Sequence, residues 1–126
     1  MRRRSFDLVD AHDGDWPYPG KDVVLVTHRE IANQPPQSRI WAGNDVLPLI
    51  DGLKRFDGGD IWVVGGSDLM HQFRQAGGLD VLEIFTMPVL LGRGVPLWLA
   101  TGEKEMATLV ESAAMDLGVV RSVYRF

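Results

Sequence analysis

The chain has 126 residues, of which 45% are apolar and 24% charged, with a formal net charge of −4 and no cysteine. This length fits one domain with one hydrophobic core, and the negative charge gives the chain as a whole no electrostatic basis for binding nucleic acid. No apolar run reaches membrane-spanning length, and without cysteine there is no disulfide framework or thiolate metal site. Neither His12 nor His71 has a partner at metal-ligand spacing, so no metal site is expected. We therefore expect one domain over residues 1–126, a composition that suits a cytoplasmic protein.

The first third of the chain predicts one helix and two strands. Residues 3–11 carry an apolar face and form the predicted helix, which the polar segment 12–15 ends. Two prolines and a glycine within residues 16–20 exclude regular pairing there. Residues 23–27 are an unbroken run of apolar and β-branched residues, typical of a strand covered on both faces. A short strand is expected at residues 39–41.

The middle of the chain alternates helices and strands. Residues 44–56 place apolar side chains at helical spacing, with Pro48 in the first turn, where proline is best tolerated. Residues 61–64 predict a short strand buried on both faces. Residues 67–75 predict a second helix of this region, and a strand is expected at residues 81–87. This order of elements indicates an α/β sandwich with a mostly parallel sheet.

The end of the chain predicts an antiparallel hairpin. Strands at residues 108–113 and 119–126 flank residues 115–118, which form a hairpin or bulged turn. Alternation along the last strand puts Arg121 and Arg125 on one face, which we expect to meet solvent. The predicted fold class is therefore α/β, with a mostly parallel sheet and a C-terminal antiparallel hairpin.

The segment around Gly65 and Gly66 predicts either an anion site or a tight turn. Residues 61–64 lead directly into the two glycines, and Ser67 and Asp68 then provide helix-start chemistry. Glycines allow a ligand to approach the backbone closely, and the first N–H groups of a helix have no partners within it. The alternative is a simple strand-to-helix turn, and spacing alone favours neither interpretation.

Positive charge is concentrated at a few places in this acidic chain. Arg2, Arg3 and Arg4 cluster at its start, and Arg29 stands alone after the strand predicted at residues 23–27. Such clusters are compatible with binding a small phosphorylated ligand. The alternatives are a disordered basic tip at the terminus and a solvated charge at a strand end.

Three motifs in order carry a resemblance to a known family. They are Val-Gly-Gly-Ser at residues 64–67, Leu-Asp-Val-Leu-Glu at 79–83 and Pro-Val-Leu-Leu-Gly-Arg-Gly-Val-Pro-Leu at 88–97. In this order and spacing the chain resembles the dihydrofolate reductase superfamily, in particular the reductase (C-terminal) domain of bacterial riboflavin-biosynthesis proteins. The resemblance covers nearly the whole chain from Arg2 and implies a dihydrofolate-reductase-like three-layer sandwich.

The resemblance also implies a cofactor site. The family holds the pyrophosphate of a nicotinamide cofactor at the Gly-Gly turn, whose two glycines are joined by a cis peptide, and holds further phosphates at a helix start that reads Arg-Arg-Ser here. A strand end that reads Thr-His-Arg here contacts the adenosine 2′-phosphate, and an arginine suits that phosphate and favours NADPH. The implied cofactor-binding residues are Arg3, Arg4, Ser5, Thr27, His28, Arg29, Gly65, Gly66, Ser67, Asp68 and Leu69.

This chain departs from the family pattern at three points. Arg2 stands where the family prefers glycine, and the Asp68 carboxylate would lie near a phosphate unless it points away and caps the helix. The family also begins several dozen residues earlier, with a central strand between the counterparts of residues 61–64 and 81–87. We therefore expect an open slot in the sheet, left by a truncated or misassigned start or filled by a second copy. The residues that protonate the substrate lie largely in that segment, so the catalytic residues are unknown.

These implications predict an NADPH-dependent reductase that transfers a hydride to a pterin- or pyrimidine-like small molecule. The activity resembles that of 5-amino-6-(5-phosphoribosylamino)uracil reductase of riboflavin biosynthesis, and the branch is often dimeric, so a homodimer is expected. An alternative is a non-catalytic nucleotide-binding or interaction module that retains the fold. A structural domain without any ligand is the third hypothesis.

Overall fold

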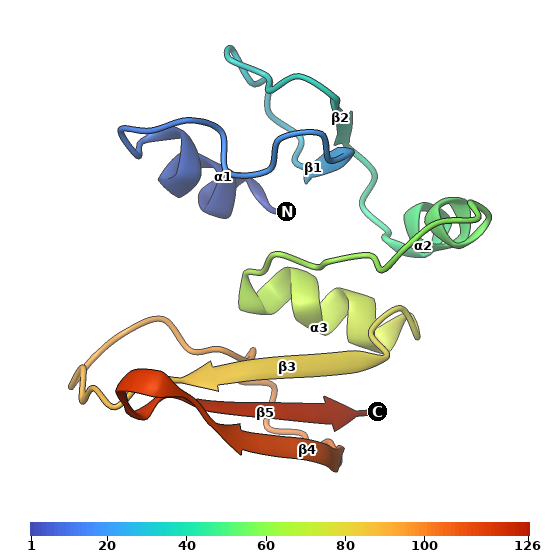
Figure 1. Cartoon of the computed structure of the whole chain (residues 1–126). Coiled ribbons are helices and arrows are strands. Elements are labelled where there is room, and N and C mark those ends of the chain that lie inside the picture. The colour runs from blue at the N-terminus through green and yellow to red at the C-terminus, as the bar shows by residue number, and fades with distance from the viewer.

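The computed structural model describes all of residues 1–126, and, apart from the strand expected at residues 61–64, its elements follow the predicted order (Figure 1). The helices and strands are α1 (Arg3–Asp10), β1 (Val23–Val26), β2 (Ser38–Trp41), α2 (Leu47–Lys54), α3 (Ser67–Gln75), β3 (Val81–Thr86), β4 (Thr108–Ala114), the short 3₁₀ turn η1 (Asp116–Gly118) and β5 (Val120–Arg125). None of the helices has the length and apolar character needed to span a bilayer.

The strands form two separate sheets instead of the single, mostly parallel sheet that the sequence predicts. β1 and β2 pair in parallel, while β3, β5 and β4 form an antiparallel sheet in that order. The C-terminal hairpin is confirmed: β4 and β5 join through η1 and are irregular between Leu109 and Glu111. Parallel pairing is thus limited to β1 and β2 and one isolated bridge between Arg2 and Val26, and β3 has one free edge.

The sheets are separate because residues 61–64 do not form the predicted strand. This segment is extended, but none of its N–H groups finds an acceptor within the chain. Its side chains are not buried on both faces either, since Ile61 is 48% and Trp62 75% exposed. A strand forms only where a neighbour supplies hydrogen-bond partners, and no strand lies beside this segment.

An apolar cavity of about 1030 Å³ separates residues 61–64 from β1, with Val24, Val26, Val63 and Leu69 among its lining. The first two residues of the chain bridge the end of this gap, because Met1 binds β1 and Arg2 N–H donates a hydrogen bond to the Gly65 carbonyl. The Met1 amino group donates a 2.7 Å hydrogen bond to the Val24 carbonyl, and the Met1 carbonyl accepts one of 2.9 Å from Val26 N–H. The unpaired segment 61–64 and the free edge of β3 are the two features expected on either side of the predicted open slot.

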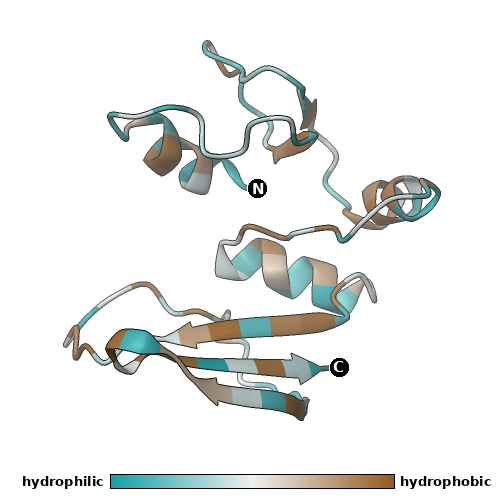
Figure 2. Cartoon of the chain, viewed as in Figure 1, coloured by the Kyte–Doolittle hydropathy of each residue, from teal (hydrophilic) through white to brown (hydrophobic).

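The buried core lies in two small clusters, both within the first 73 residues. One cluster joins α2 and α3 through Val46, Leu49, Ile50, Leu69 and Phe73. The other joins α1 to β1 through Met1, Phe6 and Leu25. In contrast, no residue of the three-stranded sheet is buried, although apolar residues run along β3 (Figure 2).

A group of side chains connects α3 to the antiparallel sheet. The Arg74 guanidinium carbon lies 4.5 Å from the centre of the Phe126 ring, and its Nε lies 2.9 Å from Glu105 Oε2. The Trp98 ring stacks on the same Phe126 ring, with the two ring centres 6.0 Å apart. α3 thus lies between the two sheets, packed on β1 through its apolar face and held through Arg74 to Phe126, which follows β5 (Figure 1).

The face of the antiparallel sheet opposite the Phe126 side chain is charged, as the alternation of side chains along β5 predicts. Arg121 forms ion pairs with Glu83 of β3 and Glu111 of β4. The hydrogen bond that it donates to Glu83, together with the charge of Glu111, raises the pKa of the Arg121 guanidinium above its ordinary value. This face therefore carries an ion-pair cluster that solvent reaches.

Candidate functional site

A second cavity, of about 810 Å³, is lined almost entirely by polar and charged side chains. It lies where the start of α1, the carboxyl ends of β1 and β2 and the middle of α3 meet. Its lining consists of Arg2, Arg3, Arg4, Asp7, Val26, Thr27, His28, Arg29, Gly43, Asn44 and Gln72. With four arginines and one acidic residue, this basic cavity suits an anionic ligand.

Parallel pairing of β1 with β2 explains why residues far apart in sequence line the same cavity. The carboxyl ends of parallel strands lie at one edge of a sheet, and ligands bind beyond that edge in open α/β folds. Thr27 extends the pairing by one residue, because its N–H donates a 3.0 Å hydrogen bond to the Trp41 carbonyl. The segments that follow β1 and β2 therefore meet, which brings Gly43 and Asn44 beside Arg29.

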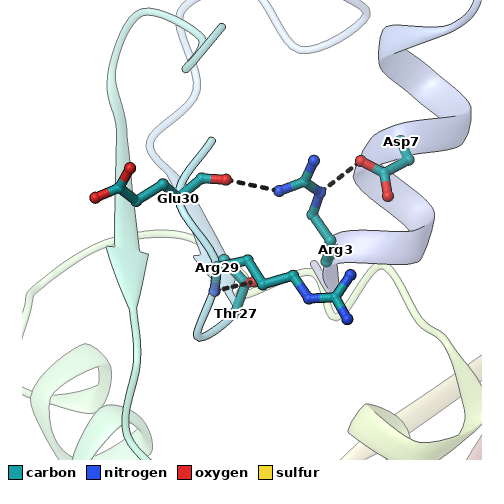
Figure 3. Close-up of polar contacts among 5 residues, drawn as sticks. All are labelled: Arg3, Asp7, Thr27, Arg29 and Glu30. Carbon is teal, nitrogen blue, oxygen red and sulfur yellow. Dashed lines mark hydrogen bonds and ion pairs between the residues drawn. The ribbon is translucent and has the colours of Figure 1, made fainter. Parts of the chain in front are cut away.

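The loop after β1 is held by the side chain of Thr27. This residue is the one buried polar residue of the chain, and its Oγ1 accepts a 3.1 Å hydrogen bond from Arg29 N–H (Figure 3). The bond closes a local turn of the kind that threonine hydroxyls make with the backbone. Arg29 is thereby placed on the wall of the basic cavity.

The arginines of the cavity differ in whether another group of the protein pairs with their guanidinium. Arg3 Nε donates a 2.6 Å hydrogen bond to Asp7 Oδ1, and its Nη1 donates one of 2.9 Å to the Glu30 carbonyl (Figure 3). Arg4 and Arg29 form no ion pair within the chain. Arg3 is therefore fixed by the protein, whereas the charges of Arg4 and Arg29 are available to a ligand.

The Gly-Gly turn has the predicted backbone form. The Gly65–Gly66 peptide is cis, and Gly65 has a φ of +43°, a left-handed value that favours glycine. A Cβ at Gly66 would meet no atom within 4 Å, so packing inside the chain does not require glycine there. The first hydrogen bond of α3 runs from Met70 N–H to the Gly66 carbonyl, so the N–H groups before Met70 lie outside the helical ladder.

The Gly-Gly turn is not part of the basic cavity, but Arg2 joins the two. Arg2 N–H donates a 3.3 Å hydrogen bond to the Gly65 carbonyl, and Arg2 Nη2 lies 2.6 Å from Asp68 Oδ2. Gln72 also donates a 3.2 Å hydrogen bond to Asp68 Oδ2. The interpretation of Asp68 as the cap of α3 is wrong, because Gly66 occupies the cap position and no side chain caps this helix.

The structure thus divides the predicted site residues into two neighbouring groups. Arg3, Arg4, Thr27, His28 and Arg29 line one cavity, while residues 65–69 form the adjoining turn and Ser5 lines neither. The Leu69 side chain belongs to the apolar core, so this residue offers only its N–H to a ligand.

Several lining residues were not predicted as site residues. These are Arg2, which departs from the family pattern, together with Asp7, Gly43, Asn44, Gln72 and Val26. Arg2 and Asp7 lie close in sequence to predicted site residues, and Gly43 and Asn44 follow β2, the strand parallel to β1. The order of the strands along the chain would have indicated the last two. No group of three or more histidine and acidic side chains lies close enough to hold a metal ion.

The chain is an α/β domain with an arginine-lined cavity at the ends of parallel strands, an arrangement whose charge suits anionic small molecules. Comparison with known families is specific: residues 18–120 match the model of the RibD C-terminal domain. The chain belongs to this family, within the dihydrofolate-reductase-like superfamily.

Two curated relatives come from Bacillus subtilis (strain 168), and both are uncharacterized. YyaP is 32% identical over 106 residues, which are 84% of this chain and 54% of YyaP. YwjB is 39% identical over 98 residues, which are 78% of this chain and 56% of YwjB. The chain thus spans about half the length of the curated relatives it matches.

Two solved structures share the fold. A Shewanella sp. PV-4 protein assigned to riboflavin biosynthesis aligns over 99% of this chain and 71% of its own, with a TM-score of 0.82 and 24% identity. A pyrimidine reductase-like protein (DIP1392) from Corynebacterium diphtheriae NCTC aligns over 81% of this chain and 49% of its own, with a TM-score of 0.55 and 18% identity.

Proposed function

We propose that this protein is an NADPH-dependent reductase that transfers a hydride to a pterin- or pyrimidine-like small molecule, in the manner of 5-amino-6-(5-phosphoribosylamino)uracil reductase. The observation that carries the proposal is the basic cavity at the ends of β1 and β2, with the turn at Gly65 and Gly66 beside it. Family membership supports the reductase class.

Arg29 is the residue that we assign to the 2′-phosphate of NADPH. It lines the cavity, forms no ion pair within the chain and is held at its backbone by Thr27. A guanidinium is always charged and forms forked hydrogen bonds with phosphate oxygens. The same cavity would hold NADH less tightly, because NADH lacks that phosphate.

The turn at Gly65 and Gly66 is the part that we assign to the pyrophosphate. N–H groups at the start of α3 stand outside the helical ladder, and the open space in front of Gly66 allows an anion to come close to the backbone. When bound, the reduced nicotinamide supplies the hydride, and the residues of this chain bind and orient the nucleotide.

A titration with NADPH and NADH tests the assignment, with Arg29→Ala as the variant and Arg125→Ala as the matched control. Arg125 is exposed on β5, away from the cavity, and forms no ion pair. We expect Arg29→Ala to weaken NADPH binding about 10- to 100-fold, the worth of charge-assisted hydrogen bonds, and to leave NADH binding unchanged. Nucleotide fluorescence is the readout, and equal affinity of the native chain for NADPH and NADH would contradict the assignment.

A nucleotide-binding module without turnover is the second candidate. The observation that favours it is that Asp7, the only acidic residue lining the cavity, is already bound by Arg3, so no free carboxylic acid faces a ligand there. Mixing the chain with NADPH and ribosylaminopyrimidine or dihydropterin substrates separates the two candidates. Oxidation of NADPH supports the reductase, and saturable binding without oxidation supports the module.

We also propose that the protein self-associates as a homodimer. Large apolar side chains are strongly exposed in both parts of the molecule, including Trp62 at 75%, Leu90 at 102% and Leu117 at 92%. Exposed apolar area of this kind commonly marks interaction surfaces. Light scattering on the purified chain should give twice the 14.0 kDa mass of one copy, and a monomer mass at micromolar concentration would contradict the proposal.

A further inference from the structure

The starts of α1 and α3 meet at Arg2, and this junction carries a charge pair of its own. Arg2 stands at the cap position of α1, and Gly66 at that of α3; neither helix has a side-chain cap. Arg2 N–H donates its hydrogen bond to the Gly65 carbonyl, which brings the two helix starts together. Two helix N-termini at one point favour a negative group there.

The Asp68 carboxylate already supplies a negative group at this junction. Its Oδ2 lies 2.6 Å from Arg2 Nη2, and the two side chains are 45% and 40% exposed, so solvent reaches both. Arg2 Nε, by contrast, is buried without a hydrogen-bond partner. The guanidinium is therefore only partly satisfied, and it lines the basic cavity while it holds Asp68.

Asp7, the one acidic residue that lines the basic cavity, provides a useful contrast with Asp68. Asp7 binds Arg3 one helical turn away within α1, so this pair remains in place whether or not a ligand is present. Arg2 and Asp68 belong to different helices, and an exposed pair of this kind is weak. A phosphate, with more charge and more acceptor oxygens than a carboxylate, would take Arg2 from Asp68.

We propose that Asp68 is a built-in competitor of the ligand phosphate at the junction of α1 and α3, and that it lowers the affinity of the site for nucleotides. This inference rests on the proposed nucleotide-binding function. A phosphate at the junction displaces the carboxylate from Arg2 and then experiences its negative charge at short range. Asp68 thus sets how tightly the site holds its ligand, while Arg29 sets which nucleotide it prefers.

Asp68→Asn tests the inference, because it removes the charge and keeps the size and the hydrogen-bonding capacity toward Gln72. Asp68→Ser removes the same charge with a smaller side chain and is measured alongside. Glu111→Gln, on the far face of the antiparallel sheet, is the control for a general loss of negative charge. The probes are NADPH and inorganic pyrophosphate, titrated at low and at high salt, with circular dichroism to verify folding of each variant.

Both Asp68 variants should bind NADPH and pyrophosphate about fivefold more tightly than the native chain at low salt, the factor expected for one like-charge interaction at about 4 Å in water. The gain should shrink at high salt, where exposed charges are screened. Glu111→Gln should not change the affinity.

The outcomes separate this inference from the proposed function. Nucleotide binding at equal or lower affinity in both Asp68 variants would overturn the inference alone. No binding by the native chain or by any variant would overturn the proposed function and this inference with it. Tighter NADPH binding in Glu111→Gln as well would assign the gain to net charge and would also overturn the inference.

Discussion

The two parts of this molecule differ in what holds them together. The part up to α3 contains every buried residue, yet its segment 61–64 leaves a row of N–H groups without partners. The antiparallel sheet of β3, β5 and β4 pairs its strands along their length, with one irregularity between Leu109 and Glu111, but has no buried residue. Buried side chains are thus concentrated in the part up to α3, and backbone pairing in the antiparallel sheet. The candidate site lies in the part that contains the core.

The prediction with the largest expected effect compares the free energy of unfolding when a buried leucine or an exposed leucine is replaced. Leu69 of α3 is 1% exposed, and Leu109 of β4 is 54% exposed. Leu69→Ala should lower the free energy of unfolding by about 2–5 kcal/mol, because it leaves a cavity in the core. Leu109→Ala should change it by less than about 1 kcal/mol. Urea unfolding followed by circular dichroism measures both, and equal losses would show that the antiparallel sheet buries its apolar face in solution.

A glycine substitution decides between an anion site and a simple turn. Gly66 has a φ of −74° and open space where a Cβ would stand, so Gly66→Ala should change stability by only about 0.5 kcal/mol. If a phosphate approaches the backbone there, the added methyl group should weaken NADPH binding at least about tenfold, or about 1.4 kcal/mol.

Gly65→Ala is measured beside Gly66→Ala to determine the cost of backbone strain at this turn. The φ of +43° at Gly65 is strained for alanine, so this substitution should cost about 1–2 kcal/mol of stability whether or not a nucleotide binds. Unchanged NADPH affinity in Gly66→Ala, with the fold intact, would identify the segment as a turn only.

The smallest expected effect concerns the link between the two parts. Arg74→Ala removes the contact with the Phe126 ring and the ion pair with Glu105, which together should contribute about 1 kcal/mol. Arg55→Ala is the control, since Arg55 is exposed and forms no ion pair. We expect tryptophan fluorescence and circular dichroism to report separate transitions in Arg74→Ala only, and coincident transitions would show that other contacts couple the parts.

Local patterns in the sequence predicted most elements well. The helix at Ser67–Gln75 was expected with the same bounds, because Ser67 and Asp68 are residues typical of a helix start and Gly77 follows the end, although no side chain caps the helix in the structure. The strands that became β1 and β3 differ from expectation by one residue at one end, and β5 is one residue shorter than expected at each end. The helix predicted at residues 44–56 is shorter, at Leu47–Lys54, since Asn44 lines the basic cavity and Asp45 accepts a 2.9 Å hydrogen bond from Leu47 N–H before the helix begins.

The sequence by itself therefore determined the family, the order of the elements that form and five of the residues that line the basic cavity, because each depends on neighbours along the chain or on motifs that can be read in order. Only the tertiary structure decided that residues 61–64 stay unpaired, since strand formation depends on a partner that no local pattern supplies. The pairing of Arg2 with Asp68 was equally beyond the sequence. Each residue looked like a separate departure from the family pattern, and their attraction acts only once the fold brings the starts of two helices together.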